Sequence, residues 1–241
     1  MKIAIHQPEF LPWTGFFHKM YISDLYVVLD HVQFKKRYFE NRNRIISPNG
    51  EISYVGIPVI TKGKFNQNIC DVEIDSTQTR WREKILNKIS HYYRRAVYFE
   101  MYFDELASII KHEYKYLIEF NMELIQFFRK HFEINCSMIK SSALPVRDYK
   151  SSELILQLCS INKADVYLCG NSGQDYLQTE EFNKHKIKIE WLNYQPIIYK
   201  QQCETFVPNL SSLDLLLNHG KDSFKFIMNA NKEKGGIACT F

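Results

Sequence analysis

Hydrophobic and polar residues follow two different patterns along this chain. Short, mostly apolar runs bounded by polar residues occur at 2–5, 25–29 and 164–169. Runs of this kind are typical of strands that are buried on both faces of a parallel sheet. Two further strands are expected at 136–139 and 187–192.

The second pattern is helical and lies between these strands. It dominates residues 75–132, where Leu117, Phe120 and Leu124 recur at spacings of three and four. We expect a helical insertion there, packed beside the sheet, with helices at 77–93, 98–110 and 113–132. Shorter helices are expected at 16–22, 151–160, 213–217 and 222–229. The alternation predicts an α/β fold with a Rossmann-like, mostly parallel sheet.

A β-hairpin is expected at about 44–59. The sequence Ser-Pro-Asn-Gly at 47–50 is a strong turn signal, and it separates two segments of strand-like residues. Because no Gly-rich or Pro-rich linker divides the 241 residues, we expect a single domain over 1–241.

Composition excludes several classes of function. The net charge of +4 is too small to indicate a nucleic-acid partner, and no apolar run approaches the roughly 20 residues that span a bilayer. The first residues do not form a secretory signal, and the six cysteines contain no CxxC pair, so we expect a cytoplasmic protein with reduced thiols. No metal-binding motif is present, and no bound metal is expected.

Polar residues that follow the expected strands are the candidates for chemistry, because ligands of α/β sheets bind beyond the carboxyl ends of the strands. His6 follows the first strand and could act as a general base, or it could be structural. Asp30 follows the second strand and could orient a histidine, take a proton or cap a turn. Gln33 lies close behind on the same edge.

A second candidate group is the loop from Gly170 to Gly173 after another strand. Its backbone amides, including that of Ser172, could hold an anion, although an ordinary turn fits equally well. Tyr176 could stack on a sugar or base, or belong to the core. Cys169 ends the strand, but a buried structural thiol fits better than a nucleophile.

A cluster of amide and guanidinium groups occupies residues 41–44. Asn41 and Asn43 would lie on one face of a strand, and Arg42 and Arg44 on the other. Arg side chains suit phosphate oxygens, and Asn amides suit hydroxyl groups or base edges. The alternative is a solvated basic edge of the hairpin.

Five motifs together resemble the WbqC-like protein family. They are residues 5–17 (IHQPEFLPWTGFF), 30–36 (DHVQFKK), 41–45 (NRNRI), 164–170 (ADVYLCG) with Tyr176-Leu177, and 206–214 (FVPNLSSLD). The motifs cover nearly the whole chain in order. Relatives often have Ser where this chain has Cys169, which argues against an essential thiol there.

The resemblance implies an enzyme of bacterial O-antigen or related surface-glycan biosynthesis. It suggests an N-acyl- or aminoacyltransferase acting on a dTDP-linked amino sugar, with acyl-CoA or an acyl-carrier-protein thioester as co-substrate and no tightly bound cofactor. On this interpretation His6, oriented by Asp30, deprotonates the amine, and Arg42 and Arg44 hold the diphosphate. The remaining expected contacts come from Gln7, Trp13, Gln33, Asn41, Asn43, Gly170, Ser172 and Tyr176. Two alternatives stay open: an ATP-dependent amide ligase, and a non-catalytic binding factor of a glycan pathway.

Overall fold

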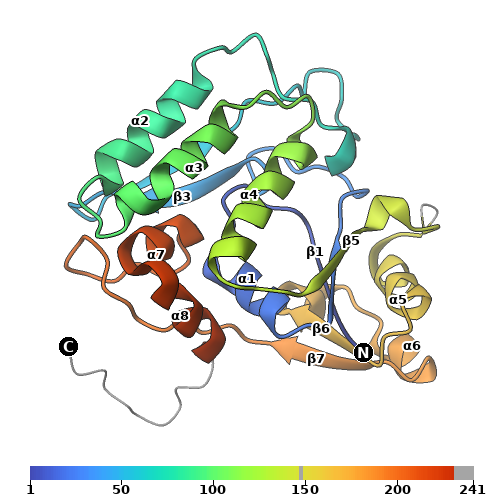
Figure 1. The fold of residues 1–241 in the computed structure, drawn as a ribbon. Coiled ribbons are helices and arrows are strands. Elements are labelled where there is room, and N and C mark those ends of the chain that lie inside the picture. Colours follow the sequence, from blue (N-terminus) through green and yellow to red (C-terminus); the bar gives the residue numbers. More distant parts are fainter. Residues whose placement is uncertain (147–148, 231–241) are drawn as a thin grey trace.

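The structure is a computed structural model that describes residues 1–146 and 149–230, apart from the side chain of Ser172. Five parallel strands form the central sheet in the order β5-β2-β1-β6-β7 (Figure 1). They are β1 (Lys2–His6), β2 (Leu25–Val28), β5 (Ser137–Lys140), β6 (Val166–Gly170) and β7 (Lys188–Leu192). All five lie where the apolar runs predicted strands, so the α/β class and the parallel sheet are confirmed.

The strand order reverses at the centre of the sheet. The chain first moves outward from β1 to β2 and β5, and then returns to the other side of β1 to add β6 and β7. The carboxyl ends of β1 and β6 therefore flank the point at which connections depart in opposite directions. In sheets of this type, that point is where ligands bind.

Side chains of the central strands alternate between two apolar cores. Ala4, Tyr26 and Val28 face a core that contains α1 (Thr14–Tyr21) and the helical insertion. Ile3, Ile5 and Val27 face a second core with α5 (Ser151–Ile161) and α6 (Thr179–Lys184). The sheet is thus covered on both faces (Figure 1), which explains why its central strands have continuous apolar sequences.

The expected insertion lies between β2 and β5. The expected antiparallel hairpin precedes its helices between the same two strands (Figure 1). These elements are β3 (Arg42–Ile46), β4 (Ile52–Gly56), α2 (Trp81–Tyr93), α3 (Phe99–Lys111) and α4 (Leu117–His131). The first helix starts at Trp81 rather than at residue 77, because the Asp75 carboxylate accepts bonds from Thr77 and Gln78 and holds a turn there.

Two helices close the described part of the chain, α7 (Ser212–His219) and α8 (Ser223–Asn229). They pack beside α1 and the insertion (Figure 1). Ser211 precedes α7, and its hydroxyl accepts a hydrogen bond from the backbone N–H of Leu213, as expected for an N-cap. The backbone N–H of Ser211 also donates to the Arg44 carbonyl at 2.9 Å, which ties α7 to the hairpin.

Candidate active site

A cavity of roughly 360 Å³ lies beyond the carboxyl end of β1. We call it the His6 pocket. It is lined by His6, Gln7, Glu9, Trp13, Tyr38, Phe39, Glu40, Arg44 and Asn209. Of the residues singled out in the sequence, it brings together His6, Gln7, Trp13 and Arg44. The other five lining residues were not predicted.

Buried asparagines hold the segments that form this pocket. The amide nitrogen of Asn43 donates to the carbonyls of Phe10 and Leu11 at 3.1 and 2.9 Å, which fixes the loop after β1 against β3. Asn121, on α4, donates to the Glu40 carbonyl at 2.8 Å. Asn43 is fully buried, and its Oδ1 accepts from the Arg44 N–H. Both polar atoms of the Asn43 side chain are therefore already hydrogen-bonded within the fold, which does not favour the predicted substrate contact.

His6 is neutral in the folded protein. Burial and the positive charge of Lys19 lower the pKa of its imidazole to about 3. Nδ1 lies 3.0 Å from the Gln7 carbonyl, which can only accept, so we assign the hydrogen to Nδ1 and the lone pair to Nε2. The His6 side chain keeps 30% of its surface exposed, and this exposed part borders the pocket.

Two buried carboxyl groups, Glu9 and Glu40, are the strongest electrostatic feature of the pocket. Burial, followed by the charge of Glu40, raises the pKa of Glu9 to about 8. Burial raises the pKa of Glu40 to about 7. Among the described residues, Oε2 of Glu9 and both carboxylate oxygens of Glu40 have no hydrogen-bond partner.

The contact between His6 and Glu9 is not an ion pair at neutral pH. Nδ1 of His6 and Oε1 of Glu9 are 3.9 Å apart, which is within ion-pair distance. However, the two pKa values of about 3 and about 8 leave the imidazole and most of the carboxyl uncharged at pH 7. The pocket therefore combines a neutral imidazole with two carboxyl groups that exchange protons near neutral pH, which is a suitable arrangement for general acid–base chemistry.

Arg44 supplies the basic side of the pocket. Its Nη2 donates to the Asn209 carbonyl at 2.7 Å, and Nε has no partner among the described residues. Arg42 lies elsewhere, because its guanidinium stacks on the Tyr54 ring at 4.5 Å from the ring centre. The two arginines predicted to bind one diphosphate are thus directed to different partners.

Asp30 belongs to a separate polar cluster at the ends of β2 and β5. Its carboxylate accepts from the Ser141 hydroxyl at 3.0 Å and from the Ser142 backbone and hydroxyl at 2.8 and 2.7 Å. His31 Nδ1 lies 2.5 Å from the Ser141 hydroxyl oxygen. His6 is instead oriented by the hydrogen bond between its Nδ1 and the Gln7 carbonyl, and not by Asp30 as the sequence suggested.

The remaining predicted contacts lie outside the His6 pocket. Gln33 donates to the Phe65 carbonyl at 3.2 Å, and Asn41 donates to the Ile57 carbonyl at 3.0 Å. Gly170 ends β6 at the switch point, and Tyr176 is 43% exposed beyond it. The side chain of Ser172 lies outside the described residues. None of these residues lines the cavity.

Cys169 packs beneath the Gly170–Gly173 loop. It is 1% exposed, and burial raises the pKa of its thiol. A Cβ on Gly173 would lie 2.0 Å from the Cys169 sulfur, so glycine is required by this contact. A buried protonated thiol is a poor nucleophile. Over residues 1–146 and 149–230 there is no cluster of three metal-ligating side chains and no helix suited to crossing a membrane.

Fold and pocket together define a class: a parallel α/β protein with a titratable polar cavity beyond the carboxyl end of its central strand. The chain belongs to the WbqC-like protein family, whose model matches residues 7–226. It is also 30% identical over 224 residues to the uncharacterized protein Rv1507c of Mycobacterium tuberculosis, an alignment that covers 92% of this chain and 95% of the relative. No solved structure matches the chain.

Proposed function

We propose that this protein is an N-acyl- or aminoacyltransferase that modifies the amine of a nucleotide-linked amino sugar for a bacterial surface glycan. The observation that carries the proposal is the pair of buried carboxyl groups, Glu9 and Glu40, beside the neutral imidazole of His6. Carboxylate oxygens without partners favour a cationic group, and the ammonium of an amino sugar is such a group.

The carboxyl pair suits the first proton transfer better than His6 does. A pKa of about 3 makes His6 a weak base toward an ammonium group, whereas carboxyls with pKa values of about 7 and 8 match it near neutral pH. The role that the sequence suggested for His6 therefore moves to Glu9 or Glu40.

The reaction then proceeds in balanced steps. The carboxylate removes one proton from the ammonium, and the free amine attacks the thioester carbonyl to form the C–N bond. His6 Nε2 takes the second proton from the now acidic nitrogen and delivers it to the departing sulfur as the C–S bond breaks. The products are an amide, a thiol and one proton that the carboxyl group releases to solvent.

Arg44 places the anionic part of the substrate. Arg44 lines the pocket from β3, whereas His6 ends β1 and Glu9 lies in the loop that follows it. A sugar whose amine lies at the two carboxyls could direct its diphosphate toward Arg44, which suits phosphate oxygens geometrically. We keep a dTDP-linked sugar as the substrate class to test first.

The test is an assay of amide formation from a dTDP-linked 4-amino or 3-amino sugar and acyl thioesters, followed by mass spectrometry. We expect an amide product without ATP. Replacing Glu9 by Gln should lower kcat/KM by about 100-fold or more, the usual contribution of a general base. Glu113→Gln is the matched control, because Glu113 is exposed and outside the pocket.

Two results would refute the proposal. Absence of amide with every thioester donor rules out the transferase. Product formation that requires ATP and releases pyrophosphate identifies an amide ligase instead.

A further inference from the structure

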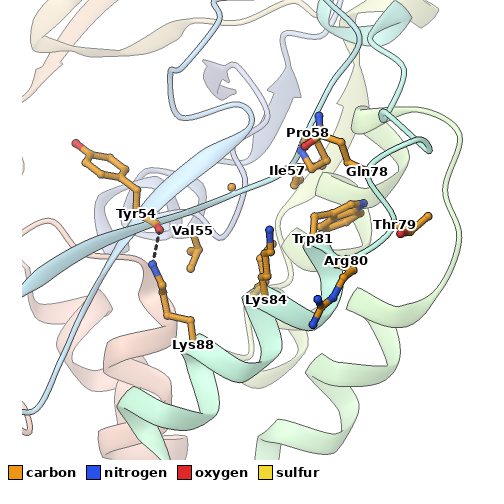
Figure 2. Close-up of a pocket in the computed structure, with 12 residues that line it drawn as sticks. Tyr54, Val55, Ile57, Pro58, Gln78, Thr79, Arg80, Trp81, Lys84 and Lys88 are labelled. Atoms are coloured by element: carbon orange, nitrogen blue, oxygen red, sulfur yellow. Dashed lines mark hydrogen bonds between the residues drawn. The ribbon is translucent and has the colours of Figure 1, made fainter.

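A basic groove runs between the β3–β4 hairpin and α2, and none of its lining residues lines the His6 pocket. It consists of two cavities of roughly 560 and 620 Å³ that share Lys88 as a lining residue. We call it the α2 groove. Figure 2 shows its first half, with Tyr54 of β4 on one side and Lys84 and Lys88 of α2 on the other.

Positive charges line the groove along one side of α2. Lys84 and Lys88 are four residues apart within α2 and share a helix face, while Arg80 precedes the helix and Arg94 and Arg95 follow its end at Tyr93. Arg80 pairs with Glu83, whereas Lys84, Lys88, Arg94 and Arg95 form no ion pair with any described residue. Glu51 is the carboxylate among the lining residues.

The geometry favours an acidic helix as the occupant. Residues four apart on a helix are separated by about 6 Å along its axis, so Lys84 and Lys88 match carboxylates at the same spacing on a partner helix. Arg94 and Arg95 follow directly after the end of α2 at Tyr93 and extend the basic surface beyond the helix.

The aromatic residues of the groove argue against a single-stranded nucleic acid. Such ligands need open ring faces on which bases can stack. Trp81 is 6% exposed, and the Arg82 guanidinium lies 4.4 Å from its ring centre. The ring of Tyr54 carries the guanidinium of Arg42. Trp81 is thus closed to base stacking, and one face of the Tyr54 ring, which is 50% exposed, is already occupied.

The α2 groove and the His6 pocket share one wall. Arg44, which lines the pocket, pairs across the hairpin with Tyr54, which lines the groove. Directly opposed residues of an antiparallel pair are about 5 Å apart. A protein bound in the groove therefore lies next to the hairpin that carries Arg44.

We propose that the α2 groove docks an acidic carrier protein that delivers the acyl group as a thioester. The inference rests on the proposed transferase, and it selects a carrier-bound donor over a free one. The acidic helix of the carrier contacts Lys84, Lys88 and Arg95, and its flexible thioester arm passes the hairpin at Arg44 to reach the two carboxyls.

The experiment measures docking and catalysis separately. Binding of a purified, acidic acyl carrier protein is followed by calorimetry at low and high salt. Transfer is assayed with the same acyl group on the carrier and on N-acetylcysteamine. The variant is Lys84→Glu with Lys88→Glu, and the control is Lys163→Glu with Lys186→Glu, two exposed lysines at the ends of α5 and α6.

We expect wild-type binding that weakens with salt, and a loss of about tenfold or more in the Lys84/Lys88 variant. KM for the carrier donor should rise by a similar factor, while transfer from N-acetylcysteamine stays unchanged. The control variant should behave like wild type. Arg94→Glu with Arg95→Glu repeats the test with other groove residues if the first variant is unstable to heat.

The outcomes separate the two proposals. Transfer from the small thioester without carrier binding, or equal losses with both donors, overturns the docking inference and leaves the transferase intact. Carrier binding through the groove without any amide product overturns the transferase alone. An oligonucleotide or polyphosphate that binds as tightly as the carrier shows a general polyanion site and overturns the inference.

Discussion

Glu9→Gln should make the free energy of unfolding less sensitive to rising pH. The pKa of Glu9 is about 8 in the folded protein, against an ordinary value of 4.5. Between these two values the folded state holds a proton that the unfolded state has released. Stability therefore falls as pH rises through this window, because the buried carboxyl must either keep its proton or carry an unfavourable charge.

The size of this pH dependence follows from the one proton that the folded state retains. One retained proton lowers the free energy of unfolding by about 1.4 kcal/mol for each pH unit inside the window. Between pH 6 and pH 8 wild type should lose about 2 kcal/mol through Glu9 alone. Gln has nearly the same shape and no proton to release, so the variant lacks this loss.

Urea unfolding at pH 6, 7 and 8 measures the difference. The free energy of unfolding of Glu9→Gln, relative to wild type, should increase steadily with pH. Contributions from His6 and Lys19 are present in both proteins and largely cancel. Glu113→Gln, an exposed glutamate, should give a curve parallel to wild type. Parallel curves for Glu9→Gln, or a gain by wild type at high pH, would show that Glu9 is not held protonated by burial.

The other predictions concern substrate binding and the fold. Arg44→Ala should raise KM for the nucleotide sugar about tenfold or more in steady-state kinetics, whereas Arg42→Ala should change it little, because Arg42 lies outside the His6 pocket. Asn43→Ala should lower the free energy of unfolding by about 3 kcal/mol in urea, because it leaves two buried carbonyls unpaired. Gly173→Ala should lower the melting temperature, and adding Cys169→Ala should restore part of it, since the sulfur at 2.0 Å is the obstacle.

Local patterns were sufficient to predict most of the fold. Strands β1, β2 and β6 are continuous apolar runs, and the turn sequence at residues 47–50 fixed the position of the hairpin. Helix α6 (Thr179–Lys184) was missed, since it has six residues and buries Phe182 alone, so no periodicity could develop. The order of the strands could not be predicted from the sequence, because parallel strands pair over long sequence distances and no local pattern indicates which strand lies beside β1.

The site was predicted only in part, for a similar reason. His6 and Trp13 stand in one recognisable segment, and the sequence placed them together with Arg44 by resemblance to a family. Glu9 and Glu40 are 31 positions apart, and their association depends on Asn43 and Asn121, which hold the two segments at one cavity. A glutamate in a loop is normally solvated, so neither residue gave a signal by type alone.

The cost of the carboxyl pair is itself an argument for its role. A purely structural polar contact at this point could be made by two amides, which would not lose stability as pH rises. Instead the fold buries Glu9 and Glu40, which are 6% and 1% exposed. Among the described residues no charged cation lies within 4 Å of either carboxyl group, and the one histidine at that distance, His6, is uncharged. Groups held at such a cost are concentrated at functional sites, where their displaced pKa values are used. A positively charged substrate relieves the cost by supplying the missing partner, so binding of an amine should be strongest where the pair carries its charge. Affinity for the amino sugar should accordingly rise with pH between about 6 and 8, until the substrate amine itself loses its proton.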